Sequence, residues 1–202
     1  MAELLIGCGS SREKLVRPQP EIASWQNLVT LDFNGDHSPD VVHDLEQIPL
    51  PFPDESFDEI HAYEVLEHTG SQGDFKFFFA QFEDFWRLLR PNGFLCGSVP
   101  NHTSVWAWGD PSHKRVIAKE SFVFLDQSEY ARQVGTTAMS DFRFLYSADF
   151  HLSYCESFEH RMFFALQAIK PSRKGGTRSP PLSARSAKAG EIATEERHGL
   201  GW

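Results

Sequence analysis

The feature that most constrains the fold is a short apolar run near the N-terminus that ends at once in two glycines, residues 4–9 (LLIGCG). Three consecutive apolar side chains predict a buried strand over 4–6. Glycine permits turns with positive φ and lets a ligand approach bare backbone amides, so Gly7 and Gly9 predict a ligand-binding turn. A buried strand that ends in such a turn, with a helix to follow, is typical of the first unit of a nucleotide-type α/β site.

The position of the third glycine in the G-x-G-x-x-G pattern holds Arg12 instead. That glycine lets the helix pack close to the strand in folds that bind a pyrophosphate. Arg12 therefore argues against NAD or FAD, and an oxidoreductase that uses a nicotinamide cofactor is disfavoured.

Apolar, β-rich runs alternate with connections over the first half of the chain. They predict strands over 4–6, 28–31, 41–43, 57–62 and 94–99. Between the last two, a helical stripe of mostly aromatic residues predicts a helix over 75–89, with Asp74 as its N-cap. This alternation is typical of a parallel sheet covered by helices.

Glycines and polar residues gather just past the predicted strand ends. They are Gly7, Gly9, Asp32, Asp44, Tyr63, Glu64 and Asn101. Ligands of open parallel sheets bind at the carboxyl ends of the strands, so this clustering indicates one binding site.

The second half of the chain is less regular. It predicts a helix near 127–133 and two closing strands over 142–146 and 162–169, paired as a hairpin with 147–161 as its connection. The expected fold class is α/β: a Rossmann-like, mostly parallel sheet of about seven strands with helices on both faces and an antiparallel hairpin at the end. Residues 1–170 would form this domain. Residues 171–202 have little apolar content and are expected to be a disordered basic tail.

The net charge of −9 disfavours a nonspecific partner such as nucleic acid or an anionic membrane. The tail from Lys170 onward carries seven basic and three acidic residues, which keeps nucleic acid possible but not favoured. Three cysteines without a spacing pattern indicate free thiols in a reducing compartment. With no secretory signal and no long apolar run, we expect a cytoplasmic protein without a membrane partner.

Four pieces of the sequence, in this order, resemble those of class I S-adenosylmethionine-dependent methyltransferases of the methyltransferase type 11-like family. They are LLIGCGSS, VTLDF, VVHDLEQIPLPFPDESFDEIHAYEVLEH and FWRLLRPNGFLCGSVPN, within residues 3–101. The third piece is the most specific, because it combines an acid after a strand, a Pro-Phe loop, an S-F-D-x-I strand and an L-E-H end.

The resemblance implies S-adenosylmethionine as cofactor and a binding role for nine residues. The implied contacts are Gly7, Cys8 and Gly9 with the methionine part, Asp32 with the ribose hydroxyls, Asp44 with the adenine amino group, Leu45 beside it, and Tyr63, Glu64 and Val65 at the methionyl end. A carboxylate accepts two donors at once, so an aspartate suits a diol. Taken alone, either aspartate would also be explained by a loop or capping role.

Methyl transfer from a sulfonium is an in-line displacement, and a base is needed only when the acceptor arrives protonated. The candidates past strand ends are His68, His102, Asp110 and His113. His113 with Asp110 ranks first, because both lie in the irregular segment where this family places acceptor contacts. Each histidine would also be explained as an ordinary loop residue. The histidines show no H-x-x-x-H or H-E-x-x-H spacing, so no metal site is predicted.

The sequence therefore predicts a methyltransferase that transfers a methyl group to an unidentified small-molecule or macromolecular acceptor. The alternative is a methyltransferase-like module that binds the cofactor without catalysing transfer. Leu5 motivates this alternative, because family members often carry a cofactor-holding acid at this position, two residues before the first glycine.

Overall fold

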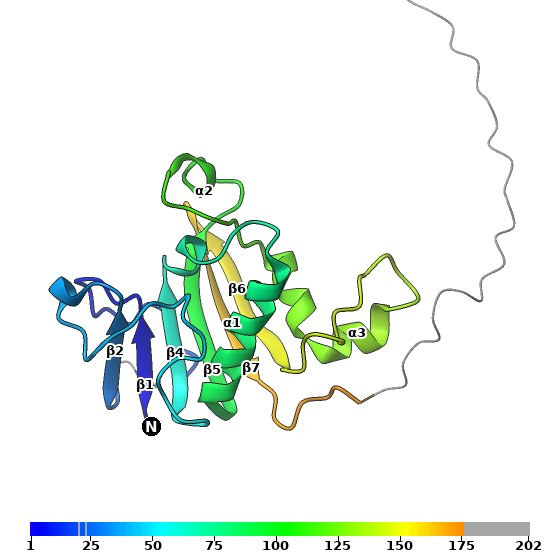
Figure 1. Cartoon of the computed structure of the whole chain (residues 1–202), viewed down its shortest axis with the longest axis horizontal. Coiled ribbons are helices and arrows are strands. Elements are labelled where there is room, and N and C mark those ends of the chain that lie inside the picture. The colour runs from blue at the N-terminus through cyan, green and yellow to red at the C-terminus, as the bar shows by residue number, and fades with distance from the viewer. Residues whose placement is uncertain (20, 23, 176–202) are drawn as a thin grey trace, which may run out of the picture.

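A seven-stranded sheet forms the centre of the protein (Figure 1), in a computed structural model that describes residues 1–175 except 20 and 23. The strands are β1 Glu3–Ile6, β2 Leu28–Asp32, β3 Val41–Val42, β4 Phe57–Tyr63, β5 Leu89–Pro100, β6 Phe150–Phe158 and β7 Arg161–Ala168. Their order in the sheet is β3-β2-β1-β4-β5-β7-β6. The first five are parallel, whereas β7 runs antiparallel to both β5 and β6, so the predicted fold class is confirmed.

In the described residues, three α-helices and three short 3-10 helices connect the strands. They are η1 Gly35–His37, η2 Leu66–His68, α1 Phe75–Leu88, α2 Trp106–Gly109, η3 Lys119–Leu125 and α3 Gln127–Gln133. The Asp74 carboxylate accepts a 3.1 Å hydrogen bond from the Phe77 amide, which confirms the predicted N-cap. In the described part of the chain, no helix combines the length and apolar character that crossing a membrane requires.

The main hydrophobic core lies between the sheet and α1, which packs over β5 in front of the sheet (Figure 1). Phe79, Phe82 and Phe85 of α1 are buried against alternate residues of the strands, such as Ile60 and Leu95. Burial of a large apolar side chain stabilises the fold by about 1.5–3 kcal/mol, so this aromatic stripe is a major source of stability. The helix predicted over 75–89 is confirmed, as α1.

The opposite face of the sheet is covered differently from the expectation. The helix expected after the glycine turn is absent from the described part of 10–27, which crosses this face as irregular chain. Lys14 is almost fully buried there, and its ammonium group lies 2.7 Å from both the Glu3 and the Glu59 carboxylates. The connection is therefore held by buried ion pairs rather than by an apolar helix face.

Histidine and tyrosine side chains of β4 extend this polar cluster. His61 Nε2 lies 2.9 Å from Glu59 Oε2, and His61 Nδ1 lies 2.7 Å from the Tyr63 hydroxyl. The same hydroxyl accepts hydrogen bonds from the amides of Leu15 and Val16. The tyrosine hydroxyl thereby fixes the irregular chain to the sheet.

The predicted strand over 142–146 is wrong, and so is the assignment of 147–161 to a connection. Residues 142–146 form turns, and β6 instead occupies Phe150–Phe158. Phe142 and Tyr146 pack on Phe79, and the Tyr146 hydroxyl donates to the Leu125 carbonyl. The aromatic residues that suggested a strand are therefore anchors of a loop on α1.

The expected disordered tail overlaps the described residues only at 171–175. Within that part, the Arg173 guanidinium lies 2.7 Å from Asp149 and 2.9 Å from Asp126. Residues 176–202 lie outside the described residues.

Candidate functional site

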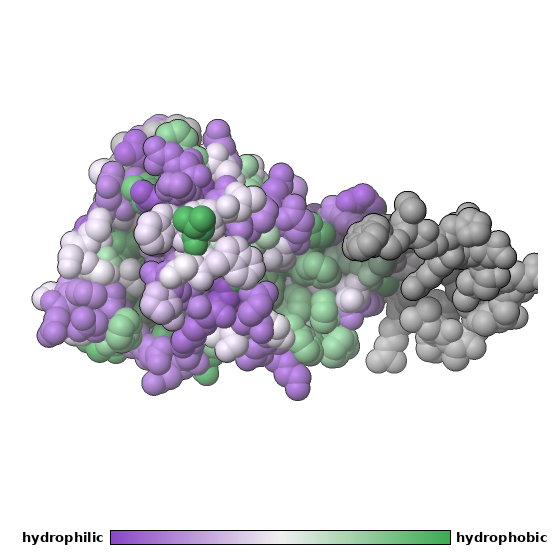
Figure 2. All heavy atoms as spheres, turned by 90° about the horizontal axis from the view of Figure 1, so that it is seen from above, coloured by the Kyte–Doolittle hydropathy of each residue, from purple (hydrophilic) through white to green (hydrophobic). Residues whose placement is uncertain are grey.

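A cavity of about 590 Å³ opens at the carboxyl ends of β1, β2 and β4. Its lining residues are Gly7, Gly9, Asp32, Phe33, His37, Asp44, Leu45, Glu46, Glu64, Val65, His68, Thr69, Ser112 and Lys114. Seven of the nine residues predicted to bind a cofactor are in this set. Seen from above, this end of the molecule is mainly hydrophilic, with hydrophobic side chains gathered on one side (Figure 2).

The glycine turn forms one wall of this cavity. Gly7 and Gly9 have φ values of 57° and 51°, in the left-handed region that favours glycine. A Cβ on Gly7 would lie 2.2 Å from a methyl group of Val65, whereas a Cβ on Gly9 would meet nothing within 4 Å. The turn thus packs on Val65 at Gly7 and leaves its backbone open to a ligand at Gly9.

Asp32 joins the end of β2 to the glycine turn. Its carboxylate accepts hydrogen bonds of 2.8 Å from the Gly9 amide and 2.9 Å from the Asn34 amide, and it lies 3.3 Å from His37 Nδ1. Burial favours a higher pKa for Asp32, but these hydrogen bonds outweigh burial and hold its pKa below the ordinary value. Asp32 is therefore a fixed negative charge at the cavity wall.

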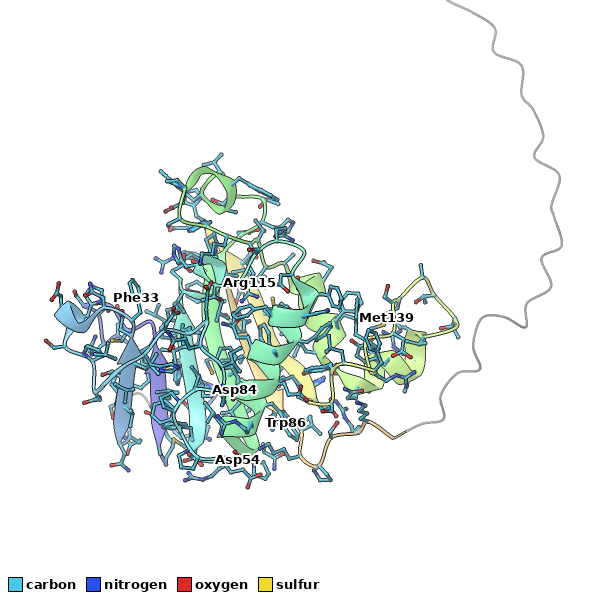
Figure 3. All side chains as sticks on the ribbon, viewed as in Figure 1. Phe33, Asp54, Asp84, Trp86, Arg115 and Met139 are labelled. Carbon is cyan, nitrogen blue, oxygen red and sulfur yellow. The ribbon has the colours of Figure 1, made fainter. Side chains whose placement is uncertain are left out.

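An exposed aromatic ring and a second carboxylate also line this cavity. Phe33 follows Asp32 directly and is 75% exposed, at the upper end of β2 (Figure 3). Asp44 is exposed and caps its own loop by accepting from the Glu46 amide at 2.9 Å. Leu45 beside it is buried. Phe33 was missed from the sequence, although its place one residue past a strand end could have indicated it.

Arg12, at the position of the missing third glycine, fixes the outside of the turn. Its guanidinium donates to the Gly9 carbonyl at 2.7 Å and to the His37 carbonyl at 3.1 Å. These bonds tie the glycine turn to the loop that follows β2, so the arginine has a structural role here.

Two of the nine predicted cofactor residues lie outside this cavity. Cys8 is buried. Together with Tyr63 it lines a separate pocket beside the irregular chain after the glycine turn. Tyr63 points away because its hydroxyl group bonds the amides of Leu15 and Val16 on the opposite face of the sheet. Successive side chains along an extended chain point to opposite faces, so the side chain of Tyr63 faces one side of the sheet and that of Glu64 faces the cavity.

A second cavity, of about 340 Å³, adjoins the first. It is lined by Glu64, Glu67, His68, Pro100, Trp106, Asp110, His113, His160 and Arg161. Glu64 and His68 line both cavities. Glu64 has a φ of 49° and accepts a 2.7 Å hydrogen bond from the Ser98 hydroxyl, so its side chain is held at the boundary.

Three of the four predicted base candidates, His68, Asp110 and His113, line this second cavity, whereas His102 is exposed and lies outside it. The His68 and His113 rings lie edge to face with centroids 4.8 Å apart. His68 Nδ1 donates to the Ser112 carbonyl at 3.2 Å, and His113 Nε2 lies 3.8 Å from Asp110 Oδ2. The hydroxyl and amide of Ser112 both donate to the Asp110 carboxylate, which holds the pKa of Asp110 below its ordinary value.

Glu67 lies beside these histidines, and its place in the sequence suggested a structural or a catalytic role equally. It is 2% exposed, and neither of its carboxylate oxygens has a hydrogen-bond partner among the described residues. Burial raises the pKa of Glu67 to about 8, and the negative charge of Glu64 acts in the same direction. A buried carboxylate without a partner is costly, so its presence at a cavity indicates a functional group.

Arg115 holds η2 and the segment 110–115 together. The buried guanidinium donates to the Leu66 carbonyl at 2.9 Å and to the Thr69 hydroxyl at 3.0 Å, and it also bonds Gln81. Burial lowers the pKa of Arg115 to about 10. Figure 3 places this side chain near the top of α1, where it fixes the backbone that carries His68 and His113.

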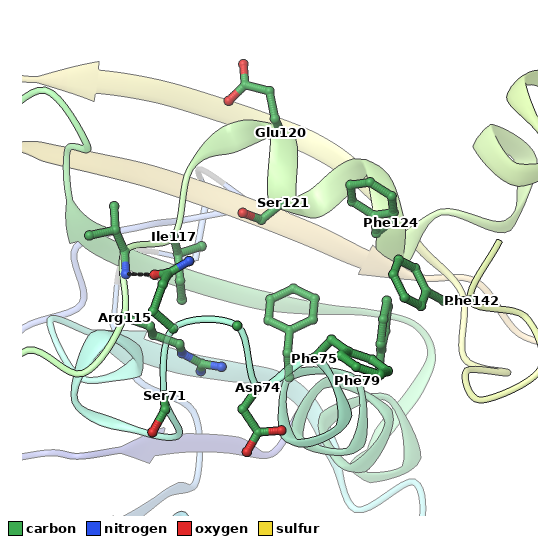
Figure 4. A pocket seen from close by; sticks show the side chains of 14 residues that line it. Ser71, Asp74, Phe75, Phe79, Arg115, Ile117, Glu120, Ser121, Phe124 and Phe142 are labelled. Atoms are coloured by element: carbon green, nitrogen blue, oxygen red, sulfur yellow. Dashed lines mark hydrogen bonds between the residues drawn. The ribbon is translucent and has the colours of Figure 1, made fainter. Parts of the chain in front are cut away.

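A third cavity, of about 320 Å³, lies between α1 and η3 (Figure 4). Its wall is mainly aromatic, with Phe75, Phe79, Phe124 and Phe142 gathered on one side. Arg115, which bonds the Leu66 carbonyl and the Thr69 hydroxyl, also lines this cavity. The described residues that line it include no histidine or cysteine.

The strand order and the strand-end site define the fold of S-adenosylmethionine-dependent methyltransferases. Residues 4–97 match the family model described as a methyltransferase domain. The resemblance found in the sequence is confirmed. A comparison with curated proteins found no match.

Two solved structures illustrate the similarity of fold. A SAM-dependent methyltransferase from Archaeoglobus fulgidus is 15% identical, with a TM-score of 0.53 over 82% of this chain and 86% of that chain. An S-adenosylmethionine-dependent methyltransferase from Mesorhizobium loti is 13% identical, with a TM-score of 0.50 over 82% of this chain and 90% of that chain. The predicted cofactor class is confirmed at the level of family and fold.

Proposed function

We propose that this protein binds S-adenosylmethionine in the cavity between the glycine turn and Phe33, and transfers its methyl group to an acceptor in the adjoining cavity. The Asp32 carboxylate would accept from the ribose hydroxyls, and Phe33 would stack on the adenine ring. Asp44 and the Leu45 backbone would contact the adenine edge. Gly9 leaves room for the methionine part along the bare backbone.

The observation that carries this proposal is that the two cavities adjoin at Glu64 and His68. One cavity has the groups that suit a nucleoside, namely a fixed carboxylate and an exposed aromatic ring. The other cavity contains the side chains that can accept a proton from the acceptor, among them His68 and His113. A methyl group placed at their boundary would face the acceptor directly, and positioning of this kind contributes roughly 7–11 kcal/mol to catalysis.

In the reaction, a lone pair of the acceptor attacks the methyl carbon and forms the new bond. The carbon–sulfur bond breaks with its electron pair remaining on sulfur, which gives S-adenosylhomocysteine. When the attacking atom carries a proton, a base takes that proton. His113 supplies this base in the proposal, with the Asp110 carboxylate 3.8 Å away to favour the imidazolium that forms.

The acceptor is a small molecule, or the projecting group of a larger one, that fits a cavity of about 340 Å³. Trp106, which is 60% exposed on α2, forms part of its entrance wall. Nucleic acid remains a less favoured acceptor because of the overall charge of −9.

The direct test is calorimetric titration of the full chain with S-adenosylmethionine and with S-adenosylhomocysteine. Saturable heat with both ligands supports the proposal, and no heat at millimolar ligand contradicts it. A panel of candidate acceptors is then incubated with the protein and S-adenosylmethionine, and mass spectrometry detects any acceptor whose mass has increased by one methyl group. Binding without transfer to any acceptor in a broad panel would favour the alternative of a non-catalytic binding module.

A further inference from the structure

We propose that Glu67, His68 and His113 form a binding site for one divalent transition-metal ion in the second cavity. The inference deepens the proposed function, on which its role in catalysis rests, because an ion here would lie beside the methyl donor and bind the acceptor. The binding itself is a separate property of these three side chains.

The first observation is the set of buried polar atoms without partners. Both carboxylate oxygens of Glu67 and the Nδ1 atom of His113 lack hydrogen-bond partners in the described part of the chain. Nine-tenths or more of buried polar groups in folded proteins are paired. Three such atoms on two neighbouring side chains at one cavity point to a ligand that is not part of the chain.

The second observation is the orientation of His68. A backbone carbonyl can only accept, so the 3.2 Å contact with the Ser112 carbonyl means that His68 Nδ1 carries the proton. The Nε2 atom then has a free lone pair, and it lies 4.0 Å from Glu67 Oε1. Histidines that bind metals typically donate their other ring N–H to a carbonyl or carboxylate in this way.

The third observation is the spacing of the ligand atoms. One ligand atom from each of the three side chains lies within 4.8 Å of the other two. Ligands at about 2.0–2.2 Å from a common ion are separated by roughly 3–4.4 Å, so small side-chain movements suffice to close the site. The bonds of Arg115 to η2 hold the backbone in this arrangement.

A second buried cluster of the same residue types provides a contrast within the molecule. Glu3, Glu59 and His61 also bring their ligand atoms within 4.8 Å of one another. There the Lys14 ammonium group lies 2.7 Å from both carboxylates and supplies the positive charge. Among the described residues no ammonium or guanidinium group bonds the Glu67 carboxylate, so the cluster at the second cavity lacks the directly bound cation that Lys14 supplies to the other.

The ligand set indicates the class of metal. Two imidazoles with one carboxylate suit Mn²⁺, Fe²⁺, Co²⁺ or Zn²⁺, whereas Mg²⁺ and Ca²⁺ favour oxygen ligands throughout. With the ion bound, His113 is a ligand and no longer the base. The three protein ligands leave coordination positions open for an acceptor oxygen, and the metal takes over the role of the base by lowering the pKa of that oxygen. Glu64 and Asp110 add negative charge at the rim.

The test is titration of the full chain, stripped with a chelator, with Co²⁺ while visible absorption and heat are recorded. We expect one ion per chain, with affinity reduced at least about tenfold in Glu67→Gln and in His113→Ala. The matched control is His102→Ala, because His102 is an exposed histidine outside both cavities. Its binding should equal that of the unchanged chain.

Binding that is undiminished in both Glu67→Gln and His113→Ala would overturn the inference, as would no binding at millimolar Co²⁺ or equal competition by Mg²⁺. Glu67→Gln preserves the shape of the side chain, and a thermal unfolding curve checks that each variant folds. Calorimetry with S-adenosylhomocysteine on the metal-free protein tests the proposed function independently. Metal binding without nucleoside binding would reject only the proposed function, and the reverse result would reject only the metal site.

Discussion

The Gly9 amide donates a 2.8 Å hydrogen bond to the Asp32 carboxylate, so the end of β2 fixes the conformation of the turn that ends β1. The two residues are adjacent in space because β1 and β2 are parallel neighbours, with Ile6 opposite Leu31. One side chain thus shapes the glycine turn and presents a negative charge to whatever the turn binds.

Replacing Asp32 should weaken nucleoside binding strongly. In Asp32→Asn the charge is lost, and the amide cannot accept from both Gly9 and Asn34 while serving the ribose. Hydrogen bonds to charged groups contribute about 1.5–3 kcal/mol, so we expect affinity for S-adenosylhomocysteine to fall about 10- to 150-fold by calorimetry. The control is Asp36→Asn, which removes an exposed carboxylate from the same loop. Equal affinities of the two variants would contradict this role.

Phe33→Ala should weaken binding without affecting stability. The ring is 75% exposed, so its removal leaves the core intact. Stacking of a base on an aromatic side chain contributes about 1–3 kcal/mol, which predicts a roughly 5- to 150-fold loss of affinity for S-adenosylhomocysteine. Phe144→Ala is the matched control, because Phe144 is 80% exposed and lies outside the cavity. Unchanged binding in Phe33→Ala would show that the adenine ring lies elsewhere.

Lys14→Met should destabilise the fold. Methionine fills a similar volume but leaves the Glu3 and Glu59 carboxylates buried without their cation. Removing one partner from a buried ion pair typically costs about 3–5 kcal/mol, and we expect a loss of this size in urea denaturation. Lys76→Met, on the exposed side of α1, should change the free energy of unfolding little. Similar values for the two variants would mean that the buried pairs contribute no net stability.

Stability should also decline in acid through Glu59. Burial favours a higher pKa for Glu59, but the hydrogen bonds from His61 and Lys14 outweigh it and lower the pKa from the ordinary 4.5. A carboxyl group whose pKa is lowered by folding contributes stability above its unfolded pKa and loses it as the pH falls through the folded pKa. We therefore expect the difference in unfolding free energy between the unchanged chain and Glu59→Gln to shrink below about pH 4.5.

Urea titrations over a series of pH values from neutral to acidic measure this difference. Glu13→Gln, an exposed change in the connection that carries Lys14, should give a curve parallel to that of the unchanged chain. A difference for Glu59→Gln that stays constant down to strongly acidic pH would contradict the assignment.

Most strands and the glycine turn could be predicted from the sequence because they depend on local patterns. Apolar runs ending in glycine or aspartate placed Gly7, Gly9 and Asp32 at strand ends, and the parallel sheet brought them to one edge. The misplaced strand at 142–146 shows the limit of such patterns. An aromatic, apolar segment has the same sequence pattern whether it pairs in a sheet or packs on a helix. Phe142 and Tyr146 pack on Phe79 of α1.

The polar clusters could not be predicted because they join residues that are far apart in the chain. The nearness of Glu67 to His113 depends on the bonds of Arg115 to Leu66 and Thr69. For Tyr63, the sequence shows the position in the chain but not the direction of the side chain. Its place at a strand end suggested the cofactor cavity, but its side chain faces the opposite side of the sheet, where it bonds Val16.

The Lys14 anchor has a consequence for how the nucleoside cavity can open. A few residues after Gly9, the ammonium group of Lys14 is held by Glu3 of β1 and Glu59 of β4, and Arg12, between Gly9 and Lys14, is tied to the loop after β2. This tether limits hinge-like motion of the first connection, so entry and exit of a ligand would depend on rearrangement of the opposite rim around Phe33 and Asp44. Exchange kinetics in this molecule should then respond to that rim far more than to the segment leaving β1.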